Sequence, residues 1–574
     1  MSQALSLEKP TAESRETAPA RSVCLLSSAN WDILLRRLSD TCSASAGVAT
    51  KFEAPPFGQY RILLNDETSG LRRSTCDFYV FAERIEDFAG PFETLDASAI
   101  PSIRQKFADY VDDIRHARAL LGGRFLVNNF APVRPFASTI AEQTGAAMGI
   151  ERLIAELNAE LVAALADLPD TQVVPVSSIV ADLGRQACDP GKYWLIGRVP
   201  FSRGFAEPYA RLVAGIMMAQ TGKTARALVI DLDNTLWGGV VGDDGMDNLK
   251  LGADHPGNQF LAVQGVLKAL ARRGILLTLV SKNTEAVALE AIREHGAMVL
   301  REKDFIAWRI NWDPKSMNID ALARELDLST ASFLFVDDNP VERAEVGENV
   351  AGIAIPNLPA DPSEWPRLLL AHPGLTTLAL SAEDLNRARS YEVRRDIRSA
   401  GSRPGGREAF LHSLGLVLEM RKIDARTQLR INQLFAKTNQ YNTTSRRYSE
   451  RELKDLVANG DDVFAVRVID KQGSDEIVGA IVVRYDGPTA SVDNFVMSCR
   501  LLGRGVETAA LSVVCERAAA HRCTTLAGAI IETPRNEPCR KLYSDHGFRA
   551  EGDGRFSLDL ATPIARPAWF EIRT

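Results

Sequence analysis

Several features are scarce in this chain of 574 residues. No run of about 18 apolar residues is present, which excludes an ordinary membrane-spanning helix, and the opening residues have no apolar signal core. There is no basic tract and the net charge is −7, so nucleic acid is not expected as a partner. We therefore expect a cytoplasmic protein without a membrane or nucleic-acid partner.

Cysteine and histidine are also used sparingly. The eight cysteines form no CxxC pair and no Cys/His metal spacing, which favours reduced, buried thiols over disulfides or zinc. His116 is the only histidine before residue 206, and it lies within a helical pattern. A histidine-dependent site in the first third of the chain is therefore not expected.

The chain is too long for a single hydrophobic core. Residues 1–21 are polar and are predicted to form a disordered tail. Apolar strands alternate with helical patterns over 22–205 and again over 206–375, which predicts two α/β domains with parallel sheets. Residues 376–574 contain strand patterns joined by polar turns, which predicts an α+β domain. The fold class is thus multidomain α/β.

A pair of carboxylates follows the apolar run 227–230. In an extended strand, Asp231 and Asp233 would point the same way, roughly 7 Å apart. Two carboxylates this close repel each other unless a cation lies between them, and Mg²⁺ prefers such oxygen ligands. A lone pair of this kind is more often a helix cap or a turn, so further residues must support the site.

Three later segments supply such residues in order. The strand pattern 274–280 precedes Ser281, Lys282 and Asn283, whose polar groups suit phosphoryl oxygens. Lys315 then follows a Pro-containing turn, and the strand pattern 332–336 precedes Asp337 and Asp338. The ends of neighbouring strands meet at one crevice in open α/β sheets.

This ordered set resembles the haloacid dehalogenase (HAD) phosphotransferase superfamily. The resemblance implies an Asp231 nucleophile that accepts a phosphoryl group, Asp233 as general acid and base, and Lys315 as a catalytic cation. It implies metal coordination by Asp231, Asp233, Asp337 and Asp338. It also implies that the substrate is held by Thr235, Ser281, Lys282 and Asn283. Neither long gap between these motifs has room for a lid domain, so we expect a capless, open site that a large partner completes.

A glycine-containing loop lies in the last domain. Arg500-x-x-Gly503-x-Gly505, between a strand and a helix, resembles the coenzyme A pyrophosphate loop of GCN5-related N-acetyltransferases (GNAT). A glycine pair at a helix start is alternatively a simple tight turn, and a fold does not establish acetyl transfer.

Four motifs in different domains narrow the resemblance. They are FGQY at 57–60, DLDNTLWGGVVGDDG from 231, KTNQYNTTSRRY at 437–448 and SCRLLGRGVE at 498–507. Together they resemble the FkbH-like proteins of polyketide biosynthesis. This resemblance implies that 1,3-bisphosphoglycerate is the substrate, that Mg²⁺ is the metal and that a glyceryl unit is loaded onto an acyl carrier protein. The phosphopantetheine arm of the carrier would be the acceptor, and coenzyme A stays open as a further cofactor.

Cys499 lies beside Arg500, where a thiolate would be stabilised, and it is a candidate acyl carrier. The alternative is a small buried residue that ends a strand. In the preceding motif, Lys437, Asn439 and Arg446 are donors that suit a carboxylate, a phosphate or an acidic carrier. That segment is alternatively a polar loop that caps the sheet.

The first α/β domain resembles the SGNH-hydrolase-like module of the same family. Ser27 and Ser28 are candidates for its serine, but an Asp-x-x-His motif is missing. We therefore expect a non-catalytic docking platform.

Two other functions remain open for the whole chain. One is a HAD phosphatase fused to a coenzyme-A-dependent N-acetyltransferase that acts on a small metabolite or sugar. The other is an assembly scaffold with vestigial sites.

Overall fold

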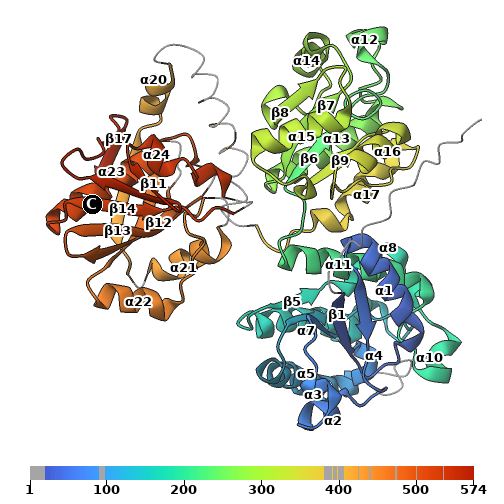
Figure 1. The fold of residues 1–574 in the computed structure, drawn as a ribbon. Coiled ribbons are helices and arrows are strands. Elements are labelled where there is room, and N and C mark those ends of the chain that lie inside the picture. Colours follow the sequence, from blue (N-terminus) through green and yellow to red (C-terminus); the bar gives the residue numbers. More distant parts are fainter. Residues whose placement is uncertain are drawn as a thin grey trace, which may run out of the picture. The chain divides into compact units, whose positions relative to one another are not determined.

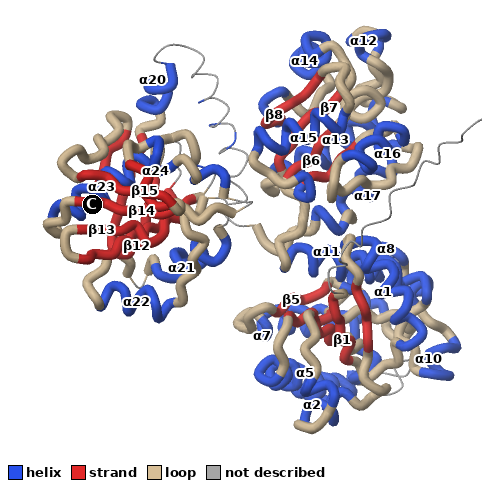
Figure 2. Tube along the Cα trace, viewed as in Figure 1, coloured by secondary structure: helices blue, strands red, loops and turns tan. Residues whose placement is uncertain are grey.

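The computed structural model describes residues 20–89, 97–380, 391, 393, 397, 406–424, 426–438, 441–471, 475–498, 501–533 and 536–574. Figure 1 shows the elements coloured along the chain, and Figure 2 shows strands gathered in three groups with helices around each. The chain divides into two compact units, the first covering most residues up to Leu380 and the second consisting mainly of Ser381–Thr574. Most of the predicted tail, residues 1–19, lies outside the described residues.

The first sheet has five parallel strands in the order β2-β1-β3-β4-β5. Its strands are β1 (Arg21–Leu26), β2 (Thr50–Glu53), β3 (Phe78–Phe81), β4 (Arg124–Asn128) and β5 (Thr171–Val174). The accompanying helices are α1 (Asp32–Ala46), α2 (Tyr60–Asn65), α3 (Gly70–Arg73), α4 (Ile85–Phe88), α5 (Ile100–Leu120), α6 (Ile140–Gln143), α7 (Ile150–Leu165), α8 (Val176–Leu183), α9 (Arg185–Cys188), α10 (Lys192–Gly197) and α11 (Arg203–Gln220).

Alternation along the strands produces two cores, one on each face of this sheet. Val23 and Leu25 of β1 belong to one hydrophobic cluster, whereas Cys24 and Leu26 belong to the other. Successive side chains of a strand point to opposite faces, so a strand that is apolar at every position needs cover on both sides. The parallel sheet expected from the sequence is therefore present.

The second sheet has the order β8-β7-β6-β9, and β6 pairs with β9 in parallel. Its strands are β6 (Ala227–Ile230), β7 (Leu276–Ser281), β8 (Phe305–Ile310) and β9 (Phe333–Val336). The accompanying helices are α12 (Val241–Asp244), α13 (Gly257–Arg272), α14 (Glu285–Glu294), α15 (Lys315–Leu326), α16 (Pro340–Asn349) and α17 (Trp365–Leu370). Every residue of β6, β7 and β9 is buried, as expected for strands covered on both faces.

The third sheet has eight strands in the order β15-β16-β14-β13-β12-β11-β10-β17. Its strands are β10 (Leu416–Lys422), β11 (Asp462–Ile469), β12 (Asp475–Asp486), β13 (Thr489–Met497), β14 (Thr525–Ala529), β15 (Arg549–Gly552), β16 (Arg555–Asp559) and β17 (Phe570–Arg573). The accompanying helices are α20 (Gly406–Ser413), α21 (Gln428–Lys437), α22 (Glu450–Ala458), α23 (Val506–Ala520) and α24 (Leu542–Asp545). From β10 to β13 consecutive strands pair antiparallel, whereas β13 and β14, joined through α23, pair in parallel.

Two further findings concern membrane-spanning helices and disulfide bonds, neither of which the sequence favours. Among the described residues, no helix combines the length and apolar composition needed to cross a bilayer. The seven cysteines within the described residues are all unpaired, and six of them are buried.

Candidate active sites

Three carboxylates gather where β6 and β9 end. Asp231 follows β6, and its backbone N–H donates to the carbonyl of Val336, 3.0 Å away, so the two strand ends are held together. Asp337 and Asp338 follow β9. One carboxylate oxygen from each of the three lies within 4.8 Å of the others. We call Asp231, Asp337 and Asp338 the acidic group.

A buried lysine partly neutralises the acidic group. Lys315 begins α15, and its Nζ lies 2.9 Å from Asp231 Oδ1 and 2.6 Å from Asp337 Oδ2. Its side chain is only 4% exposed. Burial alone would lower the pKa of Lys315, but the nearby carboxylates outweigh this effect and raise the pKa above its usual value. Lys315 is therefore a fixed positive charge.

One ammonium group does not balance three carboxylates, and the remaining charge suits a divalent cation. Burial, followed by the charge of Asp231, raises the pKa of Asp337 to about 6 and also raises that of Asp338. Asp231 Oδ1 is buried and lies 2.9 Å from the Lys315 ammonium. An all-oxygen set with excess negative charge fits Mg²⁺. The acidic group is thus a candidate metal site.

Asp233 lies outside the acidic group. Its Oδ1 accepts hydrogen bonds from Trp237 Nε1 at 2.9 Å and from the backbone N–H of Val241 at 3.0 Å. Its Oδ2 accepts one from Asn283 Nδ2 at 2.9 Å. Burial is the main reason that the pKa of Asp233 is raised. Its side chain is therefore held apart from the three clustered carboxylates, and its part as a metal ligand stays a prediction.

The other residues predicted to hold phosphate lie around the same edge. Thr235 is buried and its Oγ1 donates to Asp338 Oδ1 at 3.4 Å, while Ser281 ends the buried strand β7. Asn283 is held by Asp233 as described. Lys282 is 38% exposed and pairs with Glu342, 2.6 Å away. The structure thus brings Thr235 into contact with the acidic group and Asn283 into contact with Asp233, whereas Lys282 pairs with Glu342.

Sequence reasoning missed two residues that shape this site. Arg343 Nη1 donates to the backbone carbonyls of both Asp337 and Asp338, each at 2.7 Å, which fixes the turn after β9. Trp237 donates to Asp233. Trp237 belongs to the motif that begins at Asp231, and Arg343 lies in the helix that follows Asp338, but sequence position does not reveal which side chains bond to the site.

Two glycines of the loop in the last domain adopt a left-handed backbone conformation. Gly503 and Gly505 adopt φ of 85° and 83°, which favours glycine, and α23 begins directly afterwards. A Cβ on Gly505 would lie 2.9 Å from the Trp569 ring, so this position also lacks room for a side chain. Arg504 between them is buried, and its Nη1 lies 3.2 Å from Asp470 Oδ2.

Only the first part of β13, Thr489–Val492, pairs with β14. Beyond that point, the edge of β13 binds a segment of the preceding motif. The backbone N–H of Thr443 donates to the carbonyl of Phe495 at 3.2 Å, and that of Met497 donates to the carbonyl of Tyr441 at 3.0 Å. The residues from Tyr441 to Thr443, which we call the wedge segment, therefore occupy the edge that β14 leaves.

The remaining predicted residues of this domain are only partly described. Arg446 Nη1 binds Asp493 Oδ2 at 2.8 Å, and its guanidinium lies 4.8 Å from the centre of the Tyr448 ring. Asn439, Cys499 and Arg500 lie outside the described residues, as does the side chain of Lys437. Their predicted roles stay predictions.

Comparison with known proteins finds one match that covers most of the chain and another that covers only its C-terminal part. The chain is similar to a crystal structure of the N-terminal part of the protein BF1531 from Bacteroides fragilis, which contains a phosphatase domain complexed with Mg. The identity is 26%, the match covers 63% of this chain and 95% of that chain, and the TM-score is 0.55. Residues 429–548 match the acetyltransferase (GNAT) family. The chain is an enzyme with a phosphatase-like region and a C-terminal GNAT domain.

Two solved acetyltransferases are more distant. An N-acetyltransferase from Staphylococcus aureus Mu50 is 19% identical, with coverage of 25% of this chain and 98% of that chain and a TM-score of 0.20. A GNAT superfamily phosphinothricin acetyltransferase from Sinorhizobium meliloti, in complex with AcCoA, is 15% identical, with coverage of 26% and 94% and a TM-score of 0.21. No curated protein matches the chain significantly.

Proposed function

We propose that the chain is a Mg²⁺-dependent glyceryltransferase and phosphatase that takes 1,3-bisphosphoglycerate and loads a glyceryl unit onto an acyl carrier protein. The observation that carries the phosphatase part is the acidic group with Lys315 between two of its members. The Mg complex of the similar phosphatase-containing protein supports the choice of metal. The glyceryl and carrier parts rest on the FkbH-like resemblance of four motifs.

The buried site suits phosphoryl transfer to a carboxylate. Lys315 Nζ lies 2.9 Å from Asp231 Oδ1 and holds the carboxylate that is proposed as the nucleophile in a fixed position. A carboxylate oxygen of Asp231 attacks the phosphorus of the phosphate ester, and the bond to the leaving oxygen breaks. A metal held by Asp231, Asp337 and Asp338 would supply a Lewis acid that polarises the phosphoryl oxygens.

Asp233 is placed beside this group rather than within it. Its raised pKa is the direction required of a residue that gives a proton to the leaving oxygen. It would then take a proton from the water that hydrolyses the aspartyl phosphate. Three hydrogen bonds use three of its roughly four acceptor positions, so one position stays available for this exchange.

The mouth of the site suits a large partner. Between β6 and β7, where every residue is described, the chain forms only α12, one short 3-10 helix and α13, so no lid domain is inserted there. Apolar side chains close in sequence to the site are exposed: Trp312 at 73%, Met317 at 62% and Val341 at 71%. The carrier protein is proposed to cover these side chains when it docks at the site.

The carrier provides the test. The full-length protein, Mg²⁺, 1,3-bisphosphoglycerate and a holo acyl carrier protein are incubated together, and the carrier is weighed intact by mass spectrometry. The proposal expects a gain of one glyceryl group and the release of inorganic phosphate. Asp231→Asn should abolish phosphate release from the ester, whereas Asp243→Asn, an exposed change in α12, should not. An unchanged carrier would reject glyceryl transfer.

A second candidate function is coenzyme-A-dependent acetyl transfer, which the GNAT match over residues 429–548 favours. The wedge segment already occupies the edge of β13 beyond its pairing with β14, so an extended ligand could not form hydrogen bonds with that edge. Turnover of acetyl-coenzyme A with small amines or amino sugars, in the absence of carrier, would support this function over the first.

A further inference from the structure

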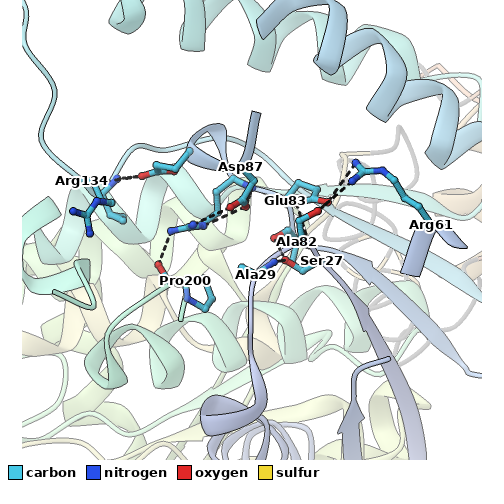
Figure 3. Close-up of polar contacts among 12 residues, drawn as sticks. Ser27, Ala29, Arg61, Ala82, Glu83, Asp87, Arg134 and Pro200 are labelled. Atoms are coloured by element: carbon cyan, nitrogen blue, oxygen red, sulfur yellow. Dashed lines mark hydrogen bonds and ion pairs between the residues drawn. The ribbon is translucent and has the colours of Figure 1, made fainter. Parts of the chain in front are cut away.

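Strands β1 and β3 of the N-terminal sheet are joined by polar contacts at their carboxyl ends. The Ser27 hydroxyl, just after β1, donates to the carbonyl of Ala82, just after β3, at 2.9 Å. The buried Glu83 accepts from the Ser28 hydroxyl at 2.7 Å, and it lies 3.4 Å from Arg61 of α2. Figure 3 shows the Ser27 contact and Arg61 reaching Glu83. The opposite ends of the same two strands are joined by different groups.

Ser22 and Asp77 connect β1 and β3 at their amino ends. The backbone N–H and the hydroxyl of Ser22 donate to Asp77 Oδ2 at 2.8 and 3.1 Å, and the backbone N–H of Asp77 donates to Ser22 Oγ at 3.1 Å. Cys76 directly precedes Asp77, and Cys24 lies two residues after Ser22. Side chains two residues apart in a strand share a face, so Ser22 and Cys24 point the same way. These hydrogen bonds therefore hold Cys76 near the face of β1 that carries Cys24.

Tyr79 fixes the position of Cys76. Tyr79 lies opposite Cys24 in the pairing of β1 with β3. The backbone N–H of Cys76 donates to the Tyr79 hydroxyl at 3.3 Å, and that hydroxyl donates to the carbonyl of Ser74 at 3.1 Å. Cys24 and Tyr79 belong to one hydrophobic cluster, and Cys76 packs against it. The segment before β3 is thus folded back over the cluster that contains Cys24.

The two thiols also interact with each other. A hydrogen bond between them is the largest cause that raises the pKa of Cys24 and lowers that of Cys76. Burial adds to the rise at Cys24, whereas Ser74 Oγ, 3.9 Å from Cys76 Sγ, adds to the lowering at Cys76. Cys24 is 7% exposed, and Cys76 is half-buried. Cys76 is therefore the more accessible sulfur and the one that ionises first.

We propose that Cys24 and Cys76 form a reversible oxidation site, which hydrogen peroxide converts into a disulfide. Both thiols are unpaired in the structure. Oxidation by peroxide requires an accessible thiolate, and a neighbouring thiol then completes the disulfide. Cys76 and Cys24 meet these two requirements in that order.

The proposed reaction uses one molecule of hydrogen peroxide as the oxidant. The Cys76 thiolate attacks one peroxide oxygen, so that an S–O bond forms, the O–O bond breaks and the leaving hydroxide takes up a proton. The Cys24 sulfur then attacks the sulfenic sulfur of Cys76, the S–S bond forms, and the S–O bond breaks. The hydroxide that leaves takes the proton of Cys24. Two thiols are thus oxidised to one disulfide while the peroxide is reduced to two waters.

The disulfide would close a loop from residue 24 to residue 76. This loop contains α1, β2, α2 and α3, and α2 supplies Arg61 to Glu83. A disulfide stabilises a fold mainly because it restricts the unfolded chain. Oxidation should therefore raise the urea concentration at the midpoint of unfolding, and dithiothreitol should reverse the shift.

Cys42 provides a matched control. It lies on α1, within the same loop, but it belongs to the hydrophobic cluster on the other face of the sheet. Burial raises the pKa of Cys42 to about 11. Cys42→Ala should therefore leave formation of the disulfide unchanged.

The test uses the full-length protein, which is reduced, exposed to hydrogen peroxide and blocked with N-ethylmaleimide before digestion. Mass spectrometry without reduction should find a peptide pair linked through Cys24 and Cys76, and dithiothreitol should separate the pair. In Cys24→Ser, oxidation should stop at a sulfenic acid on Cys76, which dimedone labels. Before oxidation, iodoacetamide at pH 7 should label Cys76 at least about 10-fold faster than Cys24.

The proposal is wrong if Cys24 and Cys76 stay free thiols in the peroxide-treated wild-type protein, or if Cys76 becomes linked to another cysteine instead. A lower urea midpoint after oxidation would also contradict it, because the disulfide would then distort the fold. Mapping in the wild-type protein requires no variant to fold. The reaction needs neither Mg²⁺ nor a carrier, so this proposal and the proposed function fail separately.

Discussion

Replacement of Lys315 by methionine tests the electrostatics of the acidic group most sharply. The substitution keeps an unbranched side chain but removes the ammonium that lies 2.9 Å from Asp231 and 2.6 Å from Asp337. Removing one partner from a buried ion pair typically costs about 3–5 kcal/mol, because the remaining charge is left buried without a counterion. We expect Lys315→Met to lower the free energy of unfolding by that amount at pH 8 in EDTA.

The loss of unfolding free energy in Lys315→Met should depend on pH and on Mg²⁺. At pH 6 the cost should be smaller, because Asp337, whose pKa is about 6, takes up a proton more readily. Added Mg²⁺ should also reduce the cost, because a bound cation replaces part of the missing charge. The assay is urea unfolding followed by tryptophan fluorescence, at both pH values and with Mg²⁺ or EDTA.

Lys282→Met is the matched control, since Lys282 lies in the same region but is 38% exposed. Its ion pair with Glu342 should contribute no more than about 1 kcal/mol. If the two substitutions cost the same in EDTA, or if Mg²⁺ leaves the effect of Lys315→Met unchanged, the electrostatic argument fails.

Three further predictions follow from the geometry. Asp233→Asn should reduce phosphatase turnover by about 100-fold or more. It should leave the Mg²⁺ affinity measured by calorimetry nearly unchanged, because the Asp233 carboxylate lies outside the acidic group, and loss of Mg²⁺ binding would contradict this. Gly505→Ala should lower the free energy of unfolding by about 1–3 kcal/mol, and by more than Gly503→Ala does, because only Gly505 faces the Trp569 ring. Urea unfolding measures both effects, and equal effects would show that contact with the ring is not the cause. The free energy of unfolding of the wild-type protein should fall by up to about 3 kcal/mol between about pH 4.5 and 7, because the native state holds a proton on Glu83 that the unfolded state releases. If Glu83→Gln kept the same dependence of unfolding free energy on pH, this explanation would be wrong.

Local patterns were sufficient to predict much of the fold. Helical periodicity predicts a helix from about Ile103 to Leu121, and α5 runs from Ile100 to Leu120. The apolar run before Asp231 is β6, and the run before Asp337 is β9. Both signals are local, because burial on two faces requires a continuous apolar strand and the polar residues follow where the strand ends.

Local sequence patterns do not predict the direction of the Asp233 side chain. Alternation along an extended strand predicts that Asp231 and Asp233 point the same way, but β6 ends at Ile230. Asn234 then adopts φ of 57°, so the chain turns and Asp233 faces Trp237. The period of two holds only within the strand.

Sequence reasoning named Ser28 as a candidate but did not predict its contacts with Glu83 and Arg61. Ser28 and Glu83 are 55 residues apart, and Ser28 and Arg61 are 33 apart. The three residues come from a different loop or helix each. The pairing of β1 with β3 brings Ser28 and Glu83 together, and α2 supplies Arg61.

The most direct test of the central claim is a crystal structure of the protein with Mg²⁺ and beryllium trifluoride, which imitates a phosphoryl group on a carboxylate. The account predicts a metal coordinated by Asp231, Asp337 and Asp338, with the fluoride adduct on Asp231. Density for the adduct on another residue, or a metal bound elsewhere while these three carboxylates stay without it, would contradict the account.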